Sequence, residues 1–368
     1  MKNSNQEKYL GDLVDKSGSI KPTIQDRIAK GYGILSEIKA ILEEIPLGKY
    51  KLERGLKLRQ AMLINGLLFN SEAWHSVSPQ DIAGLEKIDE ALLRYLLDCH
   101  PKTPLEFLFL ESGAIPIRYI LSSRRINFLQ TILKREEEEL TRRIFEAQIT
   151  KPCSGDFAEL VKKDLESIGV PFNRAFIQNT GVDAFKAFIK KKITAAAHVY
   201  LTTNQAKHSK VSDIKYEILE TQPYLMSSLF SDTETKLLTA LRSRMHESFK
   251  KNFSQMHGGQ VDCPLKCWRT NAQPVKDSQE HLLTCKPITE RFQTKDIAED
   301  VQYSDLFNRN VKKQKQLAVL FAKLLDIKKE ICEEREPDNL DPCISDTNLC
   351  NGDARSTPVL IVCSSGNK

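Results

Sequence analysis

The sequence predicts a mostly α-helical protein, and three observations lead to this fold class. Apolar residues recur at steps of three and four through most of the 368 residues, which is the period of one helix face. Helix-start signals recur between these segments, with Ser or Thr placed before a Pro or three residues before an acidic side chain. Strand signals are confined to two short stretches, Lys8–Val14 and Val211–Leu219.

In the N-terminal half, most of the expected helices have a start signal of their own. Thr23 is expected to cap the first helix, and Pro46 breaks the pattern that follows it. Ser78 precedes Pro79. Proline is favoured at the first helical position, because the N–H that it lacks would have no partner within the helix there. The expected helices are 23–41, 49–74, one that begins after Ser78, one that begins after Thr103-Pro104, 116–134 and 136–148.

In the C-terminal half, four more periodic segments predict helices at 156–168, 182–202, 231–246 and 304–334. Ser231 and Glu234 have the spacing of a capping box before the third of them. Residues 336–368 contain Pro, Asn and Gly without a helical period. We expect this tail to be disordered, because it cannot bury enough apolar surface to offset the entropy of ordering.

The composition excludes a membrane-spanning protein and a fully disordered one. Hydrophobic residues make up 40% of the chain and charged residues 28%, and the mean hydropathy is −0.38. No stretch approaches the roughly 20 apolar residues of a spanning helix. The net charge of +5 and a pI near 8.6 permit a nucleic-acid partner without requiring one.

The nine cysteines are expected to be reduced. The first six residues are polar and lack the features of a secretory signal, so we expect an intracellular protein. Nine is also an odd number, which argues against a complete set of disulfides. Clustered cysteines in such a protein are more typical of metal ligands.

One cluster has the spacing of a metal site. Cys263, Cys267, His281 and Cys285 follow the pattern C-x3-C-x13-H-x3-C. Two nearby thiolates can hold one face of Zn²⁺, and a His and a Cys four residues apart on a helix can complete a tetrahedron. The sequence therefore predicts a structural zinc site. The alternative is that the three cysteines are buried and reduced and that the histidine lies on the surface.

The stretch just before this cluster is the best candidate for contact with nucleic acid. We expect its cations, Arg242, Arg244, Lys250 and Lys251, to contact phosphates. Phe249 and Phe253 are interleaved with them and could stack on bases, or could equally be core residues. Any such basic stretch can instead be a solvated helix face, and this holds also for the other basic stretches, at 54–59, 118–125, 186–192 and 312–315.

No pattern of catalytic residues is found in the sequence. There is no adjacent pair of aspartates, no Gly-rich phosphate loop and no Gly-x-Ser-x-Gly elbow. Cys99 and His100 are neighbours, but adjacent side chains at a helix end point apart, so a buried cysteine is the simpler interpretation. We therefore expect a protein that is not an enzyme.

The order of several short motifs resembles the C-terminal part of the reverse transcriptases of non-LTR, LINE-like retrotransposons. Lys8–Gly11 reads KYLG, like the hairpin that follows the polymerase palm in that family. Leu68–Trp74 is similar to the family's L-Y-G-S-E-T-W segment of the thumb, and Leu85–Leu97 resembles the helix after it. The Cys3His cluster occupies the place of the family's C-terminal zinc knuckle.

The resemblance implies a helical thumb and connection region, followed by a small Cys3His zinc-knuckle-like module and the disordered tail. The implied layout is a primer-grip hairpin remnant at 1–22, a thumb-like domain at 23–150, a connection domain at 151–250, the knuckle at 251–290, a helix at 291–335 and the tail at 336–368. The family's catalytic aspartates lie upstream of the KYLG hairpin, so the resemblance implies a truncated, inactive protein. Such a protein would bind RNA or DNA, with no membrane partner, in the nucleus or cytoplasm.

Two other interpretations stay open. The chain could be a helical scaffold for protein interactions that binds neither nucleic acid nor metal. It could also belong to an active reverse transcriptase, if the gene extends upstream of Met1 and encodes a palm.

Overall fold

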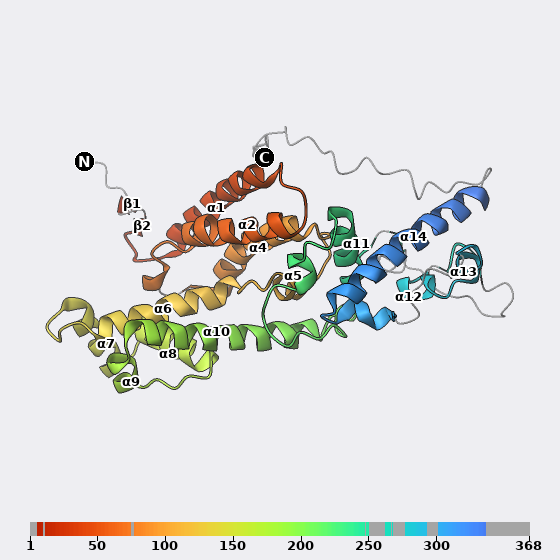
Figure 1. Ribbon diagram of the computed structural model, residues 1–368. Helices are drawn as coiled ribbons and strands as arrows, with labels where there is room; N and C mark the ends of the chain where they lie inside the picture. The colour runs from red at the N-terminus through yellow and green to blue at the C-terminus, as the bar shows by residue number, and fades with distance from the viewer. Residues whose placement is uncertain are drawn as a thin grey trace, which may run out of the picture.

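The computed structural model describes residues 6–9, 12–74, 77–246, 248–249, 262–265, 267, 277–292 and 301–335. Within these ranges the chain is mostly helical and has one two-stranded hairpin (Figure 1). The predicted fold class is therefore confirmed. The predicted tail at 336–368, Lys250, Lys251 and Phe253 lie outside the described residues.

The main elements follow one another along the chain as a hairpin and then helices of very different lengths. They are β1 (Gln6–Tyr9), β2 (Asp12–Asp15), α1 (Lys21–Leu42), α2 (Lys49–Leu58), α3 (Asn65–Leu67), α4 (Pro79–Leu97), α5 (Leu105–Ser112), α6 (Ile117–Leu133), α7 (Leu140–Thr150), α8 (Phe157–Ser167), α9 (Arg174–Asn179), α10 (Val182–Gln205), α11 (Asp232–Arg242), α12 (Gln279–Leu282), α13 (Lys286–Arg291) and α14 (Val311–Arg335). None of the helices in the described ranges is both long and apolar enough to cross a membrane.

Two of the predicted helix starts have the expected chemistry. The Ser78 side chain accepts the N–H of Asp81, whose carboxylate accepts the N–H of Ser78 in return, and this capping box opens α4. Ser231 and Glu234 form the same reciprocal pair at the start of α11. Each box satisfies two backbone N–H groups that a helix start otherwise leaves unpaired.

Thr23 does not cap α1, so that prediction is wrong. Helix α1 begins two residues earlier, with Pro22 in its first turn. The Thr23 hydroxyl instead donates to the carbonyl of Leu13 (2.8 Å) and accepts the N–H of Leu13 (3.2 Å). The side chain therefore ties the antiparallel hairpin, in which Lys8 pairs with Leu13, to the helix that follows it. Thr103 likewise provides no cap, since Pro104 is the cap residue of α5.

Three further predicted segments differ from the structure. The segment at 211–219 is a series of turns and bends and not a strand. The segment at 49–74 is interrupted, because α2 passes through a π-helical turn at Arg59–Ile64 into α3, and Asn70 then adopts a left-handed φ of 58°. The last helix begins at Val311 and not at Ser304, since Tyr303–Phe307 forms a separate 3-10 turn.

The buried apolar residues form two cores that do not follow the predicted domain boundaries. The main core joins α1–α5, the start of α6, the end of α10 and helices α11–α14. The distal core joins the rest of α6, helices α7–α9 and the first part of α10. The predicted boundary at residue 150 falls inside the distal core, so the division into 23–150 and 151–250 does not describe the packing.

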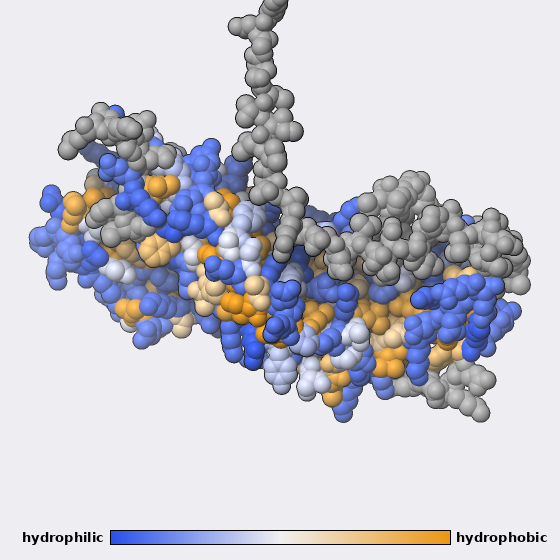
Figure 2. Space-filling view, turned by 90° about the horizontal axis from the view of Figure 1, so that it is seen from above, coloured by the Kyte–Doolittle hydropathy of each residue, from blue (hydrophilic) through white to orange (hydrophobic). Residues whose placement is uncertain are grey.

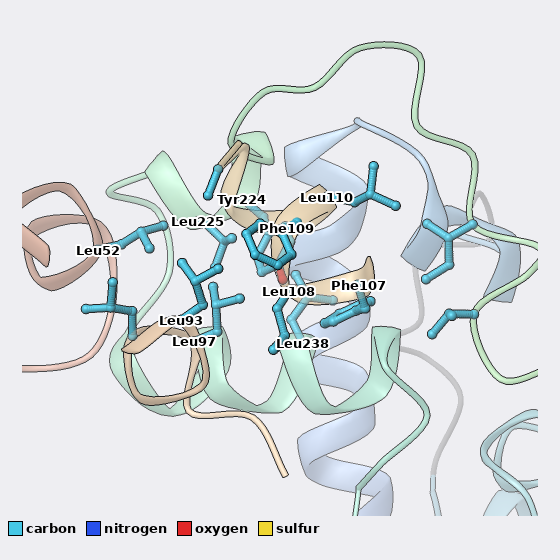
Figure 3. Packing of buried hydrophobic residues seen from close by; sticks show 14 of the residues in the cluster. Leu52, Leu93, Leu97, Phe107, Leu108, Phe109, Leu110, Tyr224, Leu225 and Leu238 are labelled. Atoms are coloured by element: carbon cyan, nitrogen blue, oxygen red, sulfur yellow. The ribbon is translucent and has the colours of Figure 1, made fainter. Parts of the chain in front are cut away.

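Two helices, α6 and α10, connect these cores. Helices α6 and α10 run side by side along the molecule, which is elongated (Figures 1 and 2). Figure 2 also shows hydrophobic residues interspersed with hydrophilic ones over this face. Helix α5 lies at the centre of the main core, where Phe107 and Phe109 are buried among leucines of α4 and α11 (Figure 3).

Candidate metal centre

Short helices position the residues of the Cys3His cluster. Ser278 caps α12 by accepting the N–H of His281 (3.1 Å), which fixes the first turn of the helix that carries the imidazole. Cys285 is the cap residue of α13, and its carbonyl accepts the N–H of Ile288 (2.9 Å). Cys263 and Cys267 come from the segment before the gap in the described residues. Both ligand pairs of the predicted set are thus brought together.

The four donor atoms are close enough to share one ion. They all lie within 4.8 Å of one another. The Sγ atoms of Cys263 and Cys285 are 3.8 Å apart, and Cys267 Sγ lies 3.1 Å from His281 Nε2. A tetrahedral zinc with Zn–S bonds of about 2.3 Å requires S···S distances of about 3.8 Å. A disulfide would instead require about 2.05 Å, so these cysteines are free thiols with the spacing of metal ligands.

The electrostatics of the cluster favour a cation. The thiol of Cys285 is hydrogen-bonded to Cys263, and this hydrogen bond, together with one from His281, lowers the pKa of Cys263 to about 4. The same contact with Cys263 raises the pKa of Cys285, and burial raises that of Cys267. One thiolate is therefore stable by itself, whereas all three together require a positive charge between them.

The cluster is part of the main core and not a separate module. Cys263 and Cys285 are buried, and they pack in the main core together with Leu265, Leu282 and Ile288. The predicted knuckle at 251–290 therefore differs from the structure in one respect, because its described part is continuous with the helical body.

Two ion pairs that the sequence analysis missed connect this region to α14. The buried Lys328 ammonium lies 2.7 Å from the Asp277 carboxylate and donates to the carbonyl of Ser248 (2.9 Å). Arg291 of α13 pairs with Glu334 at 2.5 Å. A signal for Lys328 was available, since it continues the apolar positions 317, 321 and 324 of one helix face.

Arg242 does not lie where it could contact a phosphate, so its predicted role is wrong. It is 1% exposed and forms an ion pair with Glu111 of α5 at 2.7 Å, and Glu111 itself is 0% exposed. The guanidinium also donates to the carbonyl of Leu306. The Tyr216 hydroxyl completes the cluster by donating to Glu111 (2.6 Å). The charge of Arg242 is thus neutralised inside the main core.

The other residues of the predicted nucleic-acid contact have mixed positions. Arg244 adopts a left-handed φ of 53°, which ends the helix predicted to reach residue 246. Its guanidinium pairs with Asp213 at 2.5 Å and lies 3.7 Å from Glu280. Phe249 is fully buried, which agrees with a core residue and not with a base-stacking one. Lys250 and Lys251 lie outside the described residues.

Cys99 and His100 do not form a thiolate–imidazole pair. Burial raises the pKa of the Cys99 thiol far above its usual range, and its sulfur donates to the carbonyl of Leu97 at 3.7 Å. His100 Nδ1 accepts the N–H of Lys102 at 3.1 Å. Both groups therefore have local structural contacts, as the simpler interpretation of this pair predicts.

Comparisons with known proteins do not add to this description. No protein-family model, no curated protein and no solved structure matches the chain. Any functional proposal for this protein rests on its own residues.

Proposed function

We propose that this chain is a zinc-stabilised helical protein that binds RNA or DNA and has no catalytic role. We further propose that it descends from the C-terminal part of a non-LTR reverse transcriptase. The observation that carries the proposal is the Cys263, Cys267, His281 and Cys285 cluster, whose donor atoms all lie within 4.8 Å of one another.

The donor set favours zinc in a structural role. Three sulfur atoms and one imidazole nitrogen suit a borderline-soft cation, and carboxylate ligands, which calcium and magnesium prefer, are not part of the set. All four tetrahedral positions are filled by protein side chains, so no position stays open for a substrate or a water. A metal here would hold the segment around Cys263 against α12 and α13.

The nucleic-acid part of the proposal has separate support. The chain carries a net charge of +5, which permits binding of a polyanion by its lysines and arginines. The hairpin of β1 and β2 falls where the resemblance implies one, and helices follow it as a thumb would require. The order of hairpin, helices and Cys3His cluster supports the proposed descent.

Native mass spectrometry tests the metal. We expect one zinc ion per chain after purification in reducing buffer, and loss of that ion in Cys285→Ser. The matched control is Cys153→Ser, because Cys153 is an exposed free thiol outside the cluster and should leave the zinc content unchanged. A wild-type chain that takes up no zinc would contradict the metal assignment.

Titration into labelled structured RNA at two salt concentrations tests the binding role. We expect binding that weakens steeply as salt rises, because cations on the protein displace counterions from the phosphates. A chelator should weaken the binding further if the zinc-held segment takes part. No binding at low salt would contradict this role.

A helical interaction scaffold stays the second candidate, and one observation favours it. The burial of Arg242 and the pairing of Arg244 with Asp213 withdraw two of the four cations expected to contact phosphates. A zinc-loaded protein that binds no RNA or DNA at low salt would favour this candidate.

A further inference from the structure

Helix α10 differs from the other long helices because, within the described ranges, none of its residues takes part in an ion pair. On α1, α2, α4 and α8, a lysine or arginine pairs with an acidic side chain one turn earlier, as in Lys57 with Glu53 at 2.9 Å and Lys163 with Glu159 at 2.6 Å. Helix α10 carries four lysines within two turns, Lys186, Lys190, Lys191 and Lys192. They are spread around the part of the helix that the distal core leaves uncovered, and we call this surface the α10 lysine face. Among the residues that the structure describes, none of these four has an acidic partner.

This arrangement disfavours the helix itself. Lys186 and Lys190 are exposed and lie four residues apart, so their like charges repel across one turn. The buried side of α10 gives no reason for the lysines, since Phe185, Ile189 and Ile193 fill the distal core without them. A polyanion on the α10 lysine face would remove the repulsion.

A pocket of about 410 Å³ continues this face towards the end of the helix. It is lined by Tyr119 of α6 and, from α10, by Lys192, Ala195, Val199 and Tyr200. Ala195 lies one turn beyond Lys191, so Lys191 and Lys192 lie beside the pocket, whereas Lys186 and Lys190 project from the neighbouring side of the helix. The pocket is wide open to solvent and does not enclose a ligand, so it suits a flat group such as a nucleobase that lies against its wall.

The aromatic wall of the pocket is held in place by a chain of contacts. Glu86 accepts two hydrogen bonds from Arg118, at 2.7 and 2.6 Å. Arg118 donates to the Tyr200 hydroxyl (2.9 Å) and lies over the Tyr200 ring at 4.9 Å. The rings of Tyr119 and Tyr200 then meet edge to face with centroids 5.9 Å apart. An ordered aromatic wall loses little entropy when a base packs against it.

We infer that the α10 lysine face and the Tyr119–Tyr200 pocket form a binding site for single-stranded nucleic acid. The lysines contact successive phosphates, and the pocket takes one unpaired base beside Lys192. A duplex keeps its bases stacked and paired, so only a single strand can place a base in the pocket. The inference rests on the proposed function, and it assigns the contact to α10 in place of Arg242.

The test measures binding of the full-length, zinc-loaded chain to a fluorescein-labelled oligothymidylate over a salt series. The first variant is K186E/K190E/K191E. Its control is K16E/K21E/K323E, which makes the same change of net charge at three exposed lysines outside α10 that have no ion pair among the described residues. We expect the α10 variant to bind at least about tenfold more weakly and to lower the slope of log K against log salt by about 2. The control should show only a small loss.

The pocket is tested by Ala195→Trp, which fills it from an exposed position. We expect about tenfold weaker binding of oligothymidylate and unchanged binding of an abasic oligomer with the same number of phosphates. Equal effects on both oligomers, or none on either, would overturn the assignment of a base to the pocket.

The outcomes separate this inference from the proposed function. If the wild type binds oligothymidylate and the α10 variant binds it equally well, the inference is overturned and the proposed function stays intact. The same holds if both triple variants lose binding to the same extent. A wild type that binds neither oligothymidylate nor structured RNA would overturn both. Tighter binding to vesicles of phosphatidylserine than to the oligomer would also overturn the inference, since it would make a membrane surface the preferred polyanion. Circular dichroism of each variant confirms that the helices are retained.

Discussion

Arg242 at the end of α11 and the lysines of α10 carry the same charge in opposite surroundings. Arg242 is enclosed by Glu111, Tyr216 and the carbonyl of Leu306, so its charge is satisfied within the main core. Lys186 and Lys190 face solvent. The first region uses a cation to hold α5, α11 and the 3-10 turn at Tyr303–Phe307 together. The second leaves its cations exposed to solvent, where we propose that they bind nucleic acid.

The difference follows from the position of each cation in the apolar period of its helix. Arg242 comes one turn after Leu238, on the side of α11 that faces the main core. Lys186 and Lys190 each follow a buried residue, Phe185 and Ile189, by one position, or about 100° around α10, and both are exposed. A basic stretch in a sequence is therefore informative about binding only when its phase relative to the buried residues is considered.

The largest expected effect is the loss of stability on Arg242→Met. The change leaves the Glu111 carboxylate buried without its cation, and we expect a loss of about 3–5 kcal/mol in the free energy of unfolding. Lys190→Ala is the matched change on α10 and should stay within about 0.5 kcal/mol of the wild type. Urea denaturation followed by circular dichroism measures both.

A double variant separates an uncompensated charge from lost packing. Glu111→Leu combined with Arg242→Met removes both members of the pair and should recover part of the stability lost in Arg242→Met alone. A double variant less stable than either single variant would show that the pair acts mainly through its other hydrogen bonds, to Tyr216 and Leu306.

The second effect is a loss of stability at alkaline pH that originates in the Arg242 region. Burial, followed by the charge of Glu111, raises the pKa of Tyr216 and of Tyr224 well above the usual range. An unfolded tyrosine has a pKa of about 10, so above that pH the unfolded chain loses protons that the folded chain keeps. Stability is thus fully present below about pH 10 and falls above it, by up to about 1.4 kcal/mol per pH unit for each tyrosine.

Urea midpoints between pH 8 and pH 11, with tyrosinate absorbance as a second signal, measure this dependence. Tyr216→Phe should flatten the decline in part, because it removes one of the tyrosines whose pKa is raised in the folded chain, and Tyr119, Tyr224 and Tyr303 remain. An unchanged decline in that variant would place the alkaline transition elsewhere in the chain.

The smallest expected effect has the opposite sign. Lys186→Glu places an acidic side chain one turn before Lys190, which replaces a repulsion by a favourable pair and should stabilise the protein by about 0.5 kcal/mol. The same variant should bind oligothymidylate more weakly. A gain in stability together with a loss of binding would show that Lys186 lowers the stability of the folded protein and contributes to binding.

Local chemistry determined several features that could be predicted before the structure. The Ser78 and Ser231 capping boxes depend only on side chains three residues apart, and both are present. The spacing of Cys263, Cys267, His281 and Cys285 likewise identified a set of residues that the structure brings together. The strand signal at Lys8–Val14 also falls within the hairpin, although the hairpin itself was implied only by the family resemblance.

Contacts between distant residues decided what the sequence analysis missed. Thr23 would be a normal cap in an isolated helix, but the hairpin offers both partners of its hydroxyl at Leu13. The apolar residues of 211–219 suggest a strand, yet the Tyr216 hydroxyl is held by Glu111, more than 100 residues earlier in the chain. The burial of Arg242 also depends on a distant partner, because its ion pair is with Glu111 of α5.

The sequence by itself determined the helical class, the helix starts with reciprocal caps and the metal-ligand set, because these depend on periodicity and on residues close together in the chain. Only the tertiary structure decided which cations are buried, where the two cores divide and that the Cys3His cluster joins the main core. The physical reason is that a charge is either solvated or paired according to what packs against it, and that partner is set by the fold.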